Sequence, residues 1–83
     1  MAPKRSVYVL ASQLHEGRFY VGLTSNVDHR LAAHNAGASV HTAKHRPWRI
    51  VVAVNFADEA SAFAFERYLK TGSGRAFAKR HFS

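Results

Sequence analysis

The stretch that decides the fold holds two motifs, Ser6-Val7-Tyr8 and Tyr20-Val21-Gly22. Each lies in a short run rich in β-branched and aromatic residues, and the link between the runs is polar and contains a glycine. This pattern predicts a β-hairpin. We expect Tyr8 and Tyr20 to lie opposite each other and to point to the same face, because side chains alternate along a strand. The two runs span residues 5–11 and 18–23.

The sequence after the hairpin predicts a helix, a strand and a second helix, at residues 26–36, 48–56 and 59–71. The strand is almost continuously apolar, so we expect it to be buried on both faces at the centre of the sheet. The second helix carries a broad apolar surface that includes Phe63 and Tyr68. Residues 38–47 form a loop or a short helix, and a short basic tail follows the glycines near residue 73.

Length and charge narrow the class of protein. The chain has 83 residues, which predicts a single domain over residues 1–83. It carries 12 Lys and Arg against 5 Asp and Glu, a net charge of +7, which favours nucleic acid as a partner because phosphate contacts release counterions. A membrane surface is the competing partner, but the sequence has no basic amphipathic helix or membrane span. With no cysteine either, we expect a soluble, cytoplasmic protein.

Two tyrosines and two basic residues are candidates for chemistry. Tyr8 and Tyr20 are either half-buried strand residues or hydroxyls placed over a phosphate. Arg30 and His34 lie four residues apart on one stripe of the first helix. They are either solvated surface charges or a pair in which arginine grips a phosphate and histidine relays a proton.

Glu66 is the acid that stands out, because it lies on an aromatic-rich helix in a chain with few acids. One interpretation is an ion pair with Lys70, one helical turn later. The other is a metal ligand, because a single carboxylate together with waters and substrate phosphates can hold Mg²⁺.

Further basic residues are candidates for contacts to a nucleic-acid backbone, although solvated surface charge explains them as well. Gly22 joins them because a glycine lets a backbone or a substrate approach closely. The spacing of His41 and His45 is that of half a zinc site, without the further ligands that zinc needs. The basic candidates are His41, Lys44, Arg46, Lys70, Arg75, Lys79 and Arg80.

The ordered set of Tyr8, Tyr20-Val21-Gly22, Arg30-x-x-x-His34 and Glu66 resembles the GIY-YIG nuclease family. The flanking sequences are similar to those of small stand-alone bacterial members, and the resemblance covers nearly the whole chain. It implies an α/β fold of the α+β type, with a three-stranded antiparallel sheet flanked by helices. The chain departs from the family in having Ser6 at the first motif glycine and Leu23 where repair members carry lysine.

The resemblance also implies roles for the candidate residues. Tyr8 would activate water, directly or with His34 taking its proton, and Tyr20 would position the phosphate or the water. Arg30 would stabilise the transition state, and Glu66 would hold Mg²⁺ or Mn²⁺. The implied function is a metal-dependent DNA endonuclease of the kind used in DNA repair, structure-specific or weakly sequence-specific.

Two other functions fit the same residues. One is a non-catalytic nucleic-acid-binding module that retains the nuclease fold. The other is an interaction module for acidic proteins. Tight sequence recognition by so small a chain would require a homodimer or a recruiting protein partner, because phosphate contacts position a protein without specifying sequence.

Overall fold

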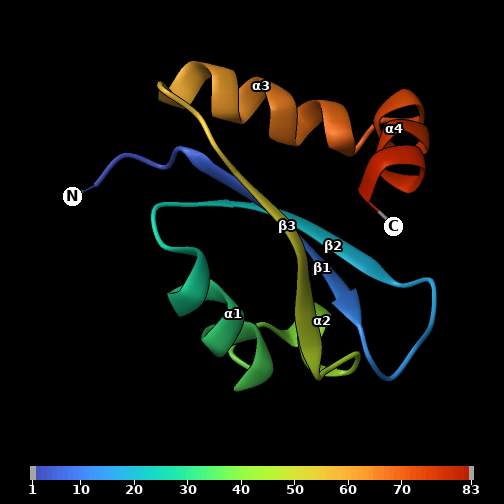
Figure 1. Cartoon of the computed structure of the whole chain (residues 1–83). Coiled ribbons are helices and arrows are strands. Elements are labelled where there is room, and N and C mark those ends of the chain that lie inside the picture. The colour runs from blue at the N-terminus through green and yellow to red at the C-terminus, as the bar shows by residue number, and fades with distance from the viewer. Residues whose placement is uncertain (1, 83) are drawn as a thin grey trace.

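β1 (Ser6–Ser12) is the middle strand of an antiparallel sheet in the computed structural model, which describes residues 2–82 (Figure 1). It pairs on one side with β2 (Phe19–Thr24) and on the other with β3 (Trp48–Asn55). The helices are α1 (Val27–Asn35), α2 (Val40–Ala43), α3 (Glu59–Leu69) and α4 (Gly72–Phe82). The predicted α+β fold with a three-stranded antiparallel sheet is therefore confirmed.

The position predicted for the third strand is wrong. β3 lies at an edge of the sheet, and Arg49, Ala53 and Asn55 on it are exposed. β1 takes the central place, and every residue from Val7 to Ser12 is buried. Val and Ile fit any pleated, half-buried surface, so an apolar composition identifies a strand without giving its place in the sheet.

The hairpin forms as predicted, but its register differs. Tyr8 pairs with Gly22, and Tyr20 pairs with Leu10, so the two tyrosines are diagonal neighbours on the same face. The Ser12 amide donates to the Arg18 carbonyl at 2.9 Å, which places the turn one residue later than expected. A shift of one residue in the turn centre moves the cross-strand partner by two residues and leaves the facing of each side chain unchanged.

One face of the sheet is covered by α1 and the other by α3 and α4 (Figure 1). α1 begins where the Asn26 side chain accepts a hydrogen bond from the His29 amide at 3.0 Å, and Gly37 follows its end with a φ of +82°. Val27 and Leu31 of α1 pack against the cluster that contains Tyr8. This helix carries the predicted Arg30 and His34 stripe onto the tyrosine face.

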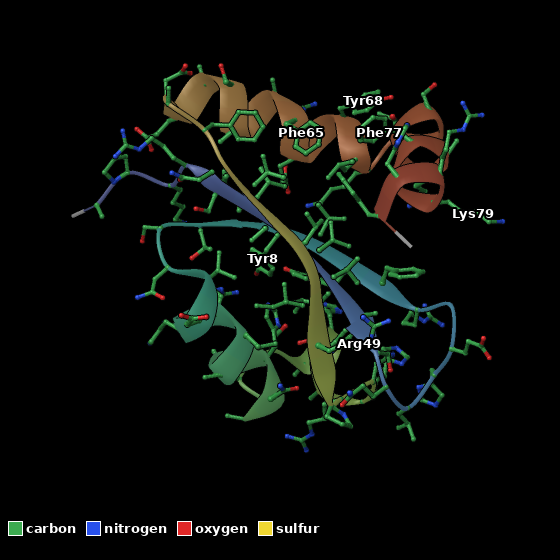
Figure 2. All side chains as sticks on the ribbon, viewed as in Figure 1. Tyr8, Arg49, Phe65, Tyr68, Phe77 and Lys79 are labelled. Carbon is green, nitrogen blue, oxygen red and sulfur yellow. The ribbon has the colours of Figure 1, made fainter. Side chains whose placement is uncertain are left out.

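The opposite face uses only part of the apolar surface predicted for residues 59–71. Val7 and Val9 point to it and pack against Ala62 and Leu69 of α3. Phe63 and Tyr68 remain 50% and 40% exposed, so they are not part of the buried stripe. Figure 2 shows Tyr68 with Phe65 and Phe77 where α3 meets α4, and their rings contact one another.

The expected basic tail is the helix α4. The Thr71 hydroxyl accepts a hydrogen bond from the Gly74 amide at 3.1 Å at its start. Gly74 allows the start of α4 to touch the end of α3, because a Cβ there would lie 1.8 Å from the Tyr68 carbonyl oxygen. Gly72 and Gly74 lie in the first turn of α4, whereas composition alone suggests that they interrupt a helix. None of the helices within residues 2–82 has the length and apolar character needed to cross a bilayer.

Candidate active site

Three side chains from three elements meet on the α1 face of the sheet. The Tyr8 hydroxyl lies 3.0 Å from Nε2 of His34, and both side chains are buried. The Tyr20 ring lies 4.7 Å from the His34 ring and 6.1 Å from the Tyr8 ring, measured between centroids. Figure 2 shows Tyr8 on this side of the sheet. The structure thus brings together Tyr8, Tyr20 and His34, with Arg30 close enough to act on the Tyr8 hydroxyl.

Both ring nitrogens of His34 have a hydroxyl partner. Nδ1 lies 2.8 Å from the Thr42 hydroxyl oxygen, and Nε2 lies 3.0 Å from the Tyr8 hydroxyl oxygen. A neutral imidazole donates through one nitrogen and accepts through the other. The result is a buried hydrogen-bonded chain from Tyr8 through His34 to Thr42, in which the tautomer of His34 sets the direction of each bond.

The surroundings of this chain keep both of its titratable members neutral. Burial raises the pKa of Tyr8 above its usual value of 10.0, and the hydrogen bond and charge of Arg30 offset part of that rise. Burial, followed by the charge of Arg30, lowers the pKa of His34 below 6.5. His34 is consequently an unprotonated acceptor at neutral pH, and Arg30 is placed to stabilise a phenolate if Tyr8 loses its proton.

Gly22 makes room for the Tyr8 ring. A Cβ on Gly22 would lie 2.3 Å from the Tyr8 hydroxyl oxygen and 2.4 Å from Cζ. The motif glycine is therefore required by a side chain of this chain, and the space that it leaves is already filled. This explains physically why a tyrosine and a glycine face each other across the two motifs.

The loop that carries Thr42 is held by the start of β3. Asn35 accepts a hydrogen bond from the Trp48 amide at 2.6 Å and donates to its carbonyl at 3.0 Å. The Trp48 indole in turn donates to the Thr42 carbonyl at 2.9 Å. These contacts fix Thr42 relative to α1, so the partner of His34 is positioned by buried hydrogen bonds.

Glu66 lies apart from the tyrosine cluster. It belongs to the sheet-facing stripe of α3, between Ala62 and Leu69, which pack on the opposite face from Tyr8. Its carboxylate is largely buried and forms an ion pair with Lys70. The structure therefore contains the ion pair between Glu66 and Lys70 that the sequence suggested.

The Glu66 carboxylate is a single hard oxygen donor. No group of three or more His, Cys, Asp or Glu within residues 2–82 is arranged to hold a metal, including His41 and His45. A single carboxylate is compatible with Mg²⁺ or Mn²⁺ when substrate phosphate and water supply the other ligands. Lys70 is 54% exposed at its side chain, so it can leave the carboxylate and turn toward solvent.

The predicted backbone-binding residues fall in separate places. His41 and Lys44 line a shallow groove beside Tyr20, and Lys70, Arg75 and Lys79 line a wider depression between the hairpin and α4. The Arg46 guanidinium lies against Gly37, and Arg80 is exposed on α4. Gly22 is buried beneath the Tyr8 hydroxyl. The groove beside Tyr20 is the one that adjoins the cluster.

Comparison with known protein families identifies the family of this chain. The GIY-YIG catalytic domain matches residues 4–80, nearly the whole chain. The chain belongs to the GIY-YIG family. A 34% identical UPF0213 protein of Staphylococcus haemolyticus aligns over 80% of this chain and 82% of its own length. A UPF0213 protein of Streptococcus pneumoniae serotype 4 is also 34% identical, over 84% of this chain and 70% of its own length.

Larger GIY-YIG proteins are also similar. The structure-specific endonuclease subunit SLX1 of Chaetomium globosum is 37% identical over 74% of this chain. The chain spans about a fifth of the length of that relative, 21%. No solved structure matches the GIY-YIG chain described here.

Two features of this GIY-YIG domain were missed in the sequence. Thr42 supports His34 from another helix, and a threonine in a basic loop gives no signal of that contact. His15 and His45 lie 2.9 Å apart between their Nδ1 atoms, although they are far apart in the chain. Only the tertiary structure brings the hairpin turn beside the loop after α2, so the sequence gives no signal of this pair.

Proposed function

We propose that this GIY-YIG domain is a metal-dependent endonuclease that hydrolyses phosphodiester bonds in DNA, with structural or weak sequence preference. The observation that carries the proposal is the buried chain from Tyr8 through His34 to Thr42, beside Arg30. Arg30 lowers the pKa of Tyr8 against the larger effect of burial. An arginine in this place would stabilise the phenolate that forms when the hydroxyl gives up its proton.

The proton path that we propose uses the tautomer of His34 that carries its hydrogen on Nδ1, toward Thr42. His34 then takes the Tyr8 proton at Nε2 and later returns it to solvent. The Tyr8 oxygen then takes a proton from the attacking water, whose oxygen forms a bond to phosphorus as the bond to the leaving oxygen breaks. The released strand oxygen is protonated by solvent. Arg30 offsets negative charge that develops on the phosphate.

Tyr20 has a distinct role because Tyr8 is only 1% exposed. Tyr20 is half-buried and lines the groove, so it connects the buried hydroxyl with the place where a substrate would lie. We assign to it the positioning of the phosphate or the water. Opening of the contact between Tyr20 and the buried residues is then part of substrate binding.

Glu66 is the residue that would hold Mg²⁺ or Mn²⁺. When bound, the metal would act as a Lewis acid on the phosphate and the leaving oxygen. β2 is an edge strand that contacts α3 on one face and carries Tyr20 on the other. A nucleic-acid strand that follows this edge would meet both faces, with Lys70 freed from Glu66 to contact a phosphate.

The test is cleavage of supercoiled plasmid and of branched DNA with Mg²⁺, Mn²⁺ or EDTA. We expect metal-dependent nicking that is lost in Glu66→Gln. Glu59→Gln is the matched control, because Glu59 is an exposed acid on the same helix. Equal nicking by both variants would remove Glu66 from the reaction, and nicking in EDTA would contradict the metal requirement.

The ion pair between Glu66 and Lys70 favours a second function, a nucleic-acid-binding module without catalysis. In that case the carboxylate serves only to anchor α3 and to balance a lysine. This function predicts salt-sensitive DNA binding that survives Glu66→Gln, with no cleavage of any substrate in any metal.

A further inference from the structure

The groove beside Tyr20 is lined by cations and joined to the buried chain. Tyr20 and Thr42 form the end that adjoins His34, and Arg18, His41, Lys44 and His45 supply its ionisable side chains. No acid is among the residues that line it within the described part of the chain. Such a groove repels metal cations and attracts an anion, so phosphate fits it better than a metal does.

His15 and His45 form a hydrogen-bonded pair at the edge of this groove, since His45 lines the groove and both histidines line the neighbouring depression. Their Nδ1 atoms are 2.9 Å apart, and their rings meet at 80° with centroids 5.0 Å apart. Such a bond requires a hydrogen on one nitrogen and a free lone pair on the other. At least one of the two histidines is therefore neutral in the protein without substrate.

The pair is held by the backbone around it. The Ser12 hydroxyl donates to the His45 carbonyl and accepts from the His15 amide at 2.9 Å. The Gln13 amide donates to the Pro47 carbonyl at 2.8 Å, which ties the hairpin turn to the loop after α2. The two rings meet because these segments are joined, so the pair is a built feature of the groove.

The charges around the pair are almost all positive. Burial, then the charges of Arg18, His15 and Lys44, lower the pKa of His45. His41 of α2 lines the groove, and the neighbouring depression, which the pair also lines, holds Lys70, Arg75 and Lys79 together with one acid, Glu16 of the hairpin turn. A bound phosphate would offset these cations and raise the pKa of His45.

We propose that this groove is a backbone subsite for a nucleic-acid strand, in which the His15–His45 pair takes up a proton when a phosphate binds. Protonation breaks the hydrogen bond within the pair and turns both rings into donors to phosphate oxygens. Arg18 and Lys44 supply the charge that does not depend on pH. The proposal rests on the proposed function and specifies how the strand beside Tyr20 is held.

Linkage gives the sign of the effect. If the complex binds more protons than the free protein, affinity rises as pH falls through the histidine range, by up to about tenfold per pH unit for one proton. The window lies between the lowered pKa of His45 in the free protein and its raised pKa in the complex. Above that window the pair stays neutral, and affinity no longer changes with pH through these groups.

The experiment is binding of a fluorescently labelled oligonucleotide in EDTA, by anisotropy, between about pH 5.5 and pH 8. Wild type is expected to bind more tightly at the lower pH, and His45→Gln and His15→Gln are each expected to flatten this dependence. His29→Gln is the matched control, because His29 is an exposed histidine of α1 that does not line the groove. Thermal unfolding checks that each variant is folded.

Salt dependence tests the permanent charges. Arg18→Gln should reduce the slope of log affinity against log salt by about 0.7 for a single strand. An unchanged pH dependence in both pair variants would overturn the proposal. So would zinc binding that requires His15 and His45 while oligonucleotide affinity is unaffected by their loss.

Failure of this proposal and failure of the nuclease proposal are distinguishable. Binding in EDTA does not depend on cleavage, so proton-linked binding without nicking would retain the subsite and reject the enzyme. Metal-dependent nicking, together with oligonucleotide binding whose pH dependence does not require the pair, would retain the enzyme and reject the subsite.

Discussion

Adding one methyl group at Gly22 should displace the tyrosine on which the proposed chemistry depends. In Gly22→Ala the new Cβ would lie 2.3 Å from the Tyr8 hydroxyl oxygen, well inside van der Waals contact. Tyr8 is 1% exposed, so its ring cannot move into solvent and must shift within packed surroundings. Overpacking of this kind costs about 1–3 kcal/mol. Reduced freedom of the unfolded chain returns about 0.4–1 kcal/mol, so a net loss of about 1–2 kcal/mol is expected.

The same shift should break the 3.0 Å bond between Tyr8 and His34. Loss of general-base catalysis then lowers the cleavage rate by about 100-fold to 10,000-fold. Chemical denaturation and single-turnover nicking measure the two effects. Gly72→Ala is the matched control, because a Cβ there meets nothing within 4 Å. Equal stability and equal nicking of the two alanine variants would refute the packing argument.

Further predictions concern Thr42, His34, the N-cap of α1 and Lys70. Thr42→Val should let the His34 proton move to Nε2 and lower nicking at least tenfold while Thr42→Ser retains it, as ¹⁵N NMR of the ring and a cleavage assay would reveal. Because burial lowers the pKa of His34 below 6.5, the unfolded chain binds more protons than the folded one below about pH 6.5. Stability should therefore fall as pH drops through this value, and the Tm of wild type should fall more steeply than that of His34→Gln. Asn26→Ala removes the cap of α1 and should cost about 1 kcal/mol in denaturant unfolding, whereas Ser25→Ala should cost little. Lys70→Gln should tighten Mn²⁺ binding, measured by calorimetry without DNA, because the cation that competes for Glu66 is gone; unchanged affinity would remove Glu66 as the ligand.

Local signals in the sequence were sufficient for much of the fold. The two ends of the first helix followed from Asn26 and Gly37, because an N-cap and a glycine with positive φ act on residues close to them in the chain. The placement of Tyr8 and Tyr20 on the same face of the sheet also followed, because side chains alternate along each strand and a shift of the turn by one residue does not change it. Register did not follow, because it is set by where the turn closes.

Features that depend on packing between distant elements could not be predicted. The edge position of β3 depends on which strand the helices on the two faces of the sheet cover. That choice is a property of the assembled sheet. The separation of Glu66 from Tyr8 is of the same kind, because the helix stripe was visible in the sequence and the face it covers was not. Thr42 and the His15–His45 pair depend on contacts between segments that only the tertiary structure brings together.

The central claim is that the buried Tyr8 hydroxyl takes part in phosphodiester hydrolysis. The most direct measurement is the single-turnover nicking rate of wild type, Tyr8→Phe and Tyr68→Phe, purified in parallel and assayed with Mn²⁺. Tyr68 is an exposed tyrosine of α3 outside the cluster, so its variant controls for contaminating nuclease and for loss of any phenol. We expect Tyr8→Phe to lose about 100-fold to 10,000-fold in rate while Tyr68→Phe cuts like wild type. Folded Tyr8→Phe protein that cuts at the wild-type rate would contradict the claim.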